Sequence, residues 1–214
     1  MKQQQFNGLT DSHAESLETT LLLVRHGETV DNARQIMQGQ TQGELNGHGR
    51  EQARAVADRL AGEQIDTVVA SDLRRAVQTA EIIAAPHGLP VVTTPLLRER
   101  DWGGFTGRFI PDLRGLVWPD DVESEQALLL RARSFLEYIT ATFPGKRVVA
   151  VGHGIVNKAV LAVYARCPMS AVQRMMNAEV RQLSLLVSRI PQECEIPFRD
   201  SGSTSALSQV PDQA

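Results

Sequence analysis

One short apolar run ends abruptly on an arginine and a histidine, and it constrains the fold more than any other stretch. Leu21–Val24 consists of four consecutive apolar residues, and Arg25, His26 and Gly27 follow directly. An apolar run that stops at a glycine turn is typical of a strand buried on both faces of a parallel sheet. Ligands bind outside the carboxyl ends of such strands. We therefore expect Arg25 and His26 to lie at a binding site.

A second apolar run ends in the same way much later in the chain. Residues 147–151 read Arg-Val-Val-Ala-Val and lead into Gly152-His153-Gly154. Two further β-type runs, at 65–70 and 91–94, alternate with amphipathic helical segments, which favours a parallel sheet covered by helices. We expect a three-layer α/β/α sandwich with a mostly parallel sheet, in which His26 and His153 meet at one edge.

The remaining elements follow from helical and strand periodicity. A last strand is expected over 182–188, and residues 29–46 and 97–121 read as long loops, of which 110–121 looks like a cover segment. Helices are predicted over five segments: Gly49–Ala61, Arg74–Ala85, Glu123–Thr142, Ile155–Ala165 and Ser170–Ala178.

Composition limits the kinds of partner that we expect. The 214 residues fit one domain over 20–190, between a flexible N-terminal extension at 1–19 and a disordered tail at 191–214. A net charge of −3 argues against nucleic acid as a partner. No apolar run approaches the ~20 residues that span a bilayer, and the N-terminus lacks the apolar core of a signal peptide. We therefore expect no membrane partner and a cytoplasmic location, whereas the oligomeric state stays open.

The two histidines and their neighbours suit phosphoryl transfer. A neutral imidazole is a nucleophile toward phosphorus, and a guanidinium group binds phosphate through two parallel hydrogen bonds. Arg25 is one such clamp, and either Arg74 or Arg75, at the start of a predicted helix, is the second.

A leaving alkoxide needs a proton, and a carboxyl group that gives it can afterwards activate water. Glu99, in the loop after the strand at 91–94, is the candidate, with Glu28 and Asp101 as nearby alternatives.

Five segments, taken in order, resemble motifs of the histidine phosphatase superfamily, which has the phosphoglycerate mutase-like fold. Together they span nearly all of the predicted domain. They are Leu-Val-Arg-His-Gly-Glu-Thr at 23–29 with Asn32 and Gln38-Gly39, Ser-Asp-Leu-Arg-Arg-Ala at 71–76, Leu-Arg-Glu-Arg-Asp-Trp-Gly at 97–103, Glu123-Ser124, and Val-Gly-His-Gly at 151–154.

The resemblance implies a role for each matching residue. It selects Arg75 over Arg74 as the second clamp, and it implies neither a metal nor a cofactor. The roles are nucleophile for His26, proton donor for Glu99, and binding of the phosphoryl group for Arg25, Arg75, His153 and Asn32.

Departures from the family pattern concern the substrate pocket. Gly152 stands where serine or threonine often precedes the second histidine. Mutases of the family usually carry a long insertion between the acid and the second histidine, whereas Glu99 and His153 are only 54 positions apart (153 − 99). We therefore predict a phosphatase with an open or lightly covered pocket, and its predicted contributors are Gln38, Gly39, Arg108 and Trp118.

The predicted protein is thus a metal-independent histidine acid-type phosphatase. It would hydrolyse a small phosphorylated metabolite through a phosphohistidine intermediate. Two alternatives stay open: a phosphoglycerate-type mutase, and a catalytically silent module that binds a phosphorylated ligand.

Overall fold

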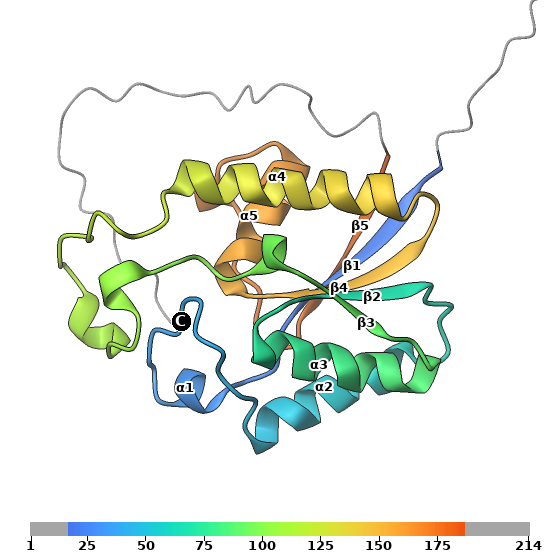
Figure 1. The fold of residues 1–214 in the computed structure, drawn as a ribbon, viewed down its shortest axis with the longest axis horizontal. Coiled ribbons are helices and arrows are strands. Elements are labelled where there is room, and N and C mark those ends of the chain that lie inside the picture. Colours follow the sequence, from blue (N-terminus) through green and yellow to red (C-terminus); the bar gives the residue numbers. More distant parts are fainter. Residues whose placement is uncertain (1–16, 187–214) are drawn as a thin grey trace, which may run out of the picture.

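The computed structural model of the protein describes residues 17–186, which form a five-stranded sheet with helices on both faces (Figure 1). The tail predicted at 191–214 lies outside the described residues, as do residues 1–16 of the predicted extension. The first strand already begins at Thr19, whose hydroxyl donates a hydrogen bond to the Phe143 carbonyl.

The strand order is β3-β2-β4-β1-β5, and only β5 runs antiparallel to its neighbour. This arrangement confirms the predicted mostly parallel sheet. The strands are β1 at Thr19–Arg25, β2 at Thr67–Ser71, β3 at Val91–Thr94, β4 at Arg147–Gly152 and β5 at Val180–Leu185.

The central pairing of β1 with β4 decides where the chemistry lies. Arg25 is opposite Gly152 in the parallel register, so His26 and His153 both follow at the same edge of the sheet. The His26 amide donates to the Gly152 carbonyl at 3.0 Å, which extends the pairing by one step past the strand end.

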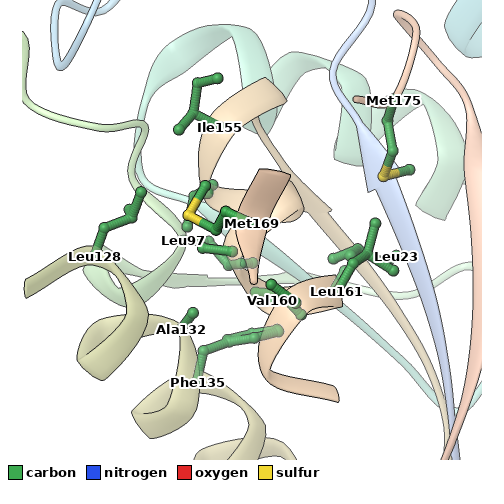
Figure 2. Close-up of a cluster of buried hydrophobic side chains, with 14 of the residues drawn as sticks. Leu23, Leu97, Leu128, Ala132, Phe135, Ile155, Val160, Leu161, Met169 and Met175 are labelled. Carbon is green, nitrogen blue, oxygen red and sulfur yellow. The ribbon is translucent and has the colours of Figure 1, made fainter. Parts of the chain in front are cut away.

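Helices pack on both faces of the sheet because successive strand residues point to opposite sides. Leu22 and Val24 join the core under α2 and α3, whereas Leu21 and Leu23 join the core under α4 and α5. Figure 2 shows Leu23 in the second of these cores, with Phe135 of α4 and Val160 of α5. The α-helices are α1 at Val30–Ala33, α2 at Gly47–Leu60, α3 at Arg74–Ala84, α4 at Glu125–Thr142 and α5 at Gly154–Ala165.

Short 3-10 turns lie in the connections between the strands and α-helices. None of the helices within residues 17–186 combines the length and the apolar character that a membrane crossing needs. The 3-10 turns lie at Ala85–His87, Pro95–Leu97, Gly103–Phe105, Ile110–Leu113 and Met169–Ala171.

The helix predicted over Ser170–Ala178 is wrong. Only the 3-10 turn at Met169–Ala171 forms there, and the chain then continues as a loop. The Met175 carbonyl accepts a hydrogen bond from Arg25 Nη1 at 2.8 Å, and the Ala178 amide donates to the Arg25 carbonyl at 3.0 Å. Ala178 itself has a φ of 57°, which no α-helix contains. Tertiary hydrogen bonds to the end of β1 therefore override the helical periodicity.

Candidate active site

His26 and His153 lie together at the carboxyl edge of the sheet. Their ring centroids are 5.0 Å apart, and both side chains are buried. Because they follow paired positions of β1 and β4, their proximity is a direct result of strand register.

The hydrogen bond of His26 determines which of its nitrogens can attack. Nδ1 lies 2.7 Å from the Gly27 carbonyl oxygen, which can only accept, so Nδ1 carries the proton. Nε2 then keeps its lone pair. Burial, reinforced by the charges of Arg75 and Arg25, holds the pKa of His26 well below its usual 6.5. The imidazole is therefore neutral at physiological pH, as a nucleophile must be.

His153 has the opposite tautomer because its partner is a donor. Arg75 Nε donates to His153 Nδ1 at 3.1 Å, so the His153 proton is on Nε2. Burial and the neighbouring Arg75 hold the pKa of His153 well below 6.5. Nε2 is buried and has no hydrogen-bond partner among residues 17–186. It is thus a free donor at the site.

The Arg75 guanidinium group donates hydrogen bonds to several parts of the chain. Its Nη1 donates to the Thr41 carbonyl at 2.5 Å, and its Nη2 donates to the Gly39 carbonyl at 2.8 Å. Burial lowers its pKa to about 10, so it stays charged at neutral pH. The neighbouring Arg74 is exposed and pairs with Glu44. The structure therefore places Arg75, and not Arg74, beside the histidines.

Arg25 is the second buried guanidinium group. Its Nη1 donates to the Met175 carbonyl, whereas its Nε is buried without a hydrogen-bond partner in the described part of the chain. Burial and the charge of Arg174 lower its pKa to about 9, which still leaves it protonated at neutral pH.

Glu99 brings the only carboxylate that lines the cavity within residues 17–186. It is buried, and its oxygens accept hydrogen bonds from the backbone amides of Arg100, Ile155 and Val156 at 2.9 to 3.1 Å. The last two amides are the unpaired donors in the first turn of α5. Of the alternative acids, Glu28 accepts from Asn46, and Asp101 accepts from the Gly103 amide; neither lines the cavity.

Asn32 is oriented by two donors. Its Oδ1 accepts from the Thr29 amide at 3.2 Å and from Asn177 Nδ2 at 3.4 Å. Thr29 and Asn32 also form the reciprocal capping box of α1, which fixes this short helix. The Asn32 Nδ2 group is left to donate, and the residue lines the cavity.

A cavity joins all of these groups except His153, which is buried behind its lining with its ring centroid 5.0 Å from that of His26. Gln38 and Gly39 line it as predicted, whereas Arg108 and Trp118 do not. The residues that line it are Arg25, His26, Asn32, Met37, Gln38, Gly39, Arg75, Glu99, Trp102, Ile155 and Arg174.

Trp118 instead belongs to the cover segment. It packs edge-on against Trp102 with 5.5 Å between ring centroids, and the Arg100 guanidinium lies 4.7 Å from its ring. Arg108 is exposed and lies over Phe105. Neither predicted residue therefore reaches the cavity: Trp118 packs against the lining residue Trp102, and the Arg108 side chain is exposed.

Sequence reasoning missed Arg174 and Asn177. Both lie in the segment 170–178, whose periodicity predicts a helix on which an arginine would be solvated. Asn177 Nδ2 donates to the His26 carbonyl at 3.0 Å, which ties the loop to the histidine. The one available signal in the sequence is a polar residue, Asn177, just before the last strand. Such a signal does not indicate which residues Asn177 contacts.

Gly152 also has a local explanation. A Cβ placed there would lie 2.2 Å from Asn157 Oδ1. Asn157 Nδ2 in turn donates to the Val24 carbonyl at 3.0 Å. The Asn157 amide therefore fills the space that a larger residue before His153 would need.

Comparison with known proteins agrees with this geometry. A family model described as the histidine phosphatase superfamily (branch 1) matches residues 21–189. The chain belongs to the histidine phosphatase superfamily. This membership confirms both the predicted family and the predicted fold.

Named phosphatases and mutases both occur among the relatives of this superfamily member. It is 35% identical to the metal-independent phosphoserine phosphatase of Arabidopsis thaliana, over 86% of this chain and 83% of that protein. It is equally 35% identical to phosphoglycerate mutase-like protein 4 of the same plant, over 86% and 85% of the two chains. The vanadate-bound structure of mycobacterial glucosyl-3-phosphoglycerate phosphatase shares 32% identity and a TM-score of 0.71, over 77% of this chain and 92% of that one.

Proposed function

We propose that the protein hydrolyses a small phosphomonoester through a phosphohistidine formed on Nε2 of His26. The observation that carries the proposal is the opposite placement of the protons on the two histidines. His26 Nε2 keeps a lone pair, whereas His153 Nε2 carries a proton, and the two ring centroids are only 5.0 Å apart. Phosphoryl transfer needs a nucleophile of this kind together with donors around the phosphoryl oxygens.

In the first step, His26 Nε2 forms a bond to phosphorus, and the bond from phosphorus to the ester oxygen breaks. Arg25, Arg75, the His153 Nε2 proton and the Asn32 amide stabilise the charge on the phosphoryl oxygens. Protonated Glu99 gives its proton to the leaving oxygen, which departs as an alcohol.

In the second step, water attacks the phosphorus atom of the phosphohistidine. The Glu99 carboxylate accepts the proton of that water, and the bond between nitrogen and phosphorus breaks. Inorganic phosphate forms, and His26 returns to its neutral state with the proton still on Nδ1. The backbone amides at the start of α5 stabilise the Glu99 carboxylate in this half of the cycle.

Charge stabilisation by arginine supports a metal-independent mechanism. Within residues 17–186, no group of three or more His, Cys, Asp or Glu side chains is placed to hold a metal ion. The named relatives that act on phosphoserine and on glucosyl-3-phosphoglycerate support a small phosphorylated metabolite as the substrate. We place the reaction in the cytoplasm, in line with the sequence-based expectation.

A mutase would share the first step and would return the phosphoryl group to a second hydroxyl instead of to water. Relatives named as mutases keep this alternative in view. The short connection from Glu99 to His153 favours hydrolysis, because it leaves little chain to shut water out of the site. A silent binding module would not need the nucleophile and the acid together in one cavity.

The test is hydrolysis of p-nitrophenyl phosphate in the presence of EDTA. We expect wild-type turnover to persist in EDTA, and His26→Ala to lower kcat/KM by roughly 10⁴-fold or more, because the covalent route is lost. Quenching with alkaline detergent after reaction with ³²P-labelled substrate should trap a base-stable phosphoprotein in the wild type alone, and later acid treatment should release its label. An inactive wild type between pH 5 and pH 8, or activity that survives in His26→Ala, would overturn the proposal.

A further inference from the structure

Arg174 is a cavity residue that the proposed chemistry does not use. It lies in the loop between α5 and β5 and lines the cavity beside Glu99 and Ile155. Its Nε is buried and has no hydrogen-bond partner in the described chain. Burial lowers its pKa, yet nothing in the site neutralises it: Glu99 raises its pKa only through space, and these two side chains form no ion pair.

The guanidinium group of Arg174 lies close to Gly154, the first residue of α5. A Cβ on this glycine would lie 2.7 Å from both Nε and Nη2 of Arg174. The next two residues of α5 donate their amides to Glu99. Arg174 therefore lies against the same turn that holds the proton donor, which is the side of the leaving group. Arg75 is instead engaged with His153 and the loop at 39–42.

When Glu99 is protonated and a phosphomonoester is bound, one positive charge of the cavity lining has no negative partner. Its lining contains three arginines and one carboxylate. A phosphomonoester brings nearly two negative charges at neutral pH. When Glu99 carries the proton for the leaving group, it is neutral, and the three guanidinium groups face those two charges alone. A singly charged anion on the leaving group would balance the third arginine, whereas a second phosphate would exceed it.

We propose that Arg174 binds a carboxylate on the leaving group, so that the natural substrate is a small phosphomonoester of a hydroxy acid. The proposal rests on the phosphatase function proposed above. A guanidinium group with unused donors matches the planar geometry of a carboxylate. Because the site would bury this arginine unpaired when the substrate lacks the acid, substrates without it are disfavoured.

The test compares substrates that differ only in the acid. O-phosphoserine is paired with O-phosphoethanolamine, and 3-phosphoglycerate is paired with glycerol 3-phosphate. We expect the wild type to prefer the acid in at least one pair. Arg174→Gln should lower kcat/KM for that acid roughly 10- to 100-fold, the range expected for losing a charged hydrogen bond. For the substrate of the same pair that lacks the acid, kcat/KM should fall by less than about 3-fold.

Two further variants separate this role from a structural one. Gly154→Ala keeps the arginine and pushes its guanidinium group aside, so it should lower the same acid preference while Tm stays near the wild-type value. It also keeps the test valid if Arg174→Gln fails to fold. Arg59→Gln, on the exposed side of α2, is the matched control and should leave both substrates of each pair unchanged.

Equal losses on both members of a pair would show that Arg174 binds the transferred phosphoryl group, and would overturn the proposal. So would a wild type that prefers the acid in neither pair. A wild type that hydrolyses none of the four compounds and no p-nitrophenyl phosphate would instead refute the phosphatase function itself.

Discussion

The ends of β1 and β4 are almost the same structure with opposite chemistry. Each strand is apolar, each ends at the same edge of the sheet, and each delivers a buried histidine. At the end of β1, Nδ1 meets the Gly27 carbonyl, and at the end of β4 it meets the Arg75 guanidinium. One imidazole thus presents a lone pair and the other a proton. The difference arises from a single hydrogen-bond partner and not from the strand, the burial or the residue type.

Removing the hydrogen bond from Arg75 to His153 should therefore have the larger effect on kcat/KM. Arg75→Lys keeps a positive charge but removes the fixed Nε donor and the contacts to the Thr41 and Gly39 carbonyls. We expect kcat/KM for p-nitrophenyl phosphate to fall by roughly 10²- to 10³-fold, because the proton on His153 Nε2 is no longer specified. The tautomer of His153 should change in a ¹⁵N spectrum of labelled imidazoles, and an unchanged spectrum would contradict this account.

Loosening the end of β1 should have a smaller effect. Asn177→Ala removes the donor to the His26 carbonyl and to Asn32 Oδ1, but leaves the bond from Nδ1 to Gly27. We expect a loss of about 10-fold in kcat/KM, most of it in kcat, because the groups are less well positioned. Asn177→Asp keeps the shape but sets a negative charge against two acceptor oxygens, so it should lose at least as much activity as Asn177→Ala. Full activity in both variants would show that Asn177 only closes the loop.

The smallest effect concerns the dependence of stability on pH, to which the histidines at the ends of β1 and β4 should contribute in the same direction. Both histidines have a pKa held below 6.5 in the folded protein, whereas the unfolded chain takes up protons below pH 6.5. The unfolded state then binds more protons, so stability falls as the pH decreases through 6.5. We expect Tm to decrease by about 2–4 °C for each kcal/mol lost, measured without phosphate between pH 7.5 and pH 5. His153→Gln should flatten this slope, and an identical slope would contradict the neutral state of His153.

The sequence was sufficient for the residues that follow the central strands. Continuous apolar runs locate β1 and β4, and parallel pairing then brings His26 and His153 together. Arg74 and Arg75 could not be separated by pattern, because helical phase at the first turn depends on where the helix begins. The structure begins α3 at Arg74, so that Arg75 faces the site and Arg74 faces solvent.

The loop before β5 could not be predicted, for a different physical reason. Its periodicity suits a helix, but its backbone forms hydrogen bonds with Arg25 and His26 instead, residues about 150 positions away in the sequence. Such long-range partners leave no local pattern. Arg174 was missed for this reason, and Arg108 and Trp118 were expected in the pocket because a cover segment gives no indication of which side chains face inward.

The separation of Arg174 from the strand ends has an evolutionary consequence. The two histidines proposed to handle phosphorus follow paired strands, so the sheet register sets their placement. The arginine proposed to bind the rest of the substrate is held on a loop, and its guanidinium group lies beside Gly154 of α5. Other residues of the same loop hold Arg25 and His26, because the Met175 carbonyl and the Asn177 amide bind them. A lineage can therefore exchange substrates by substituting Arg174 while inheriting the reaction unchanged, so this single position is the natural place to begin a directed-evolution library.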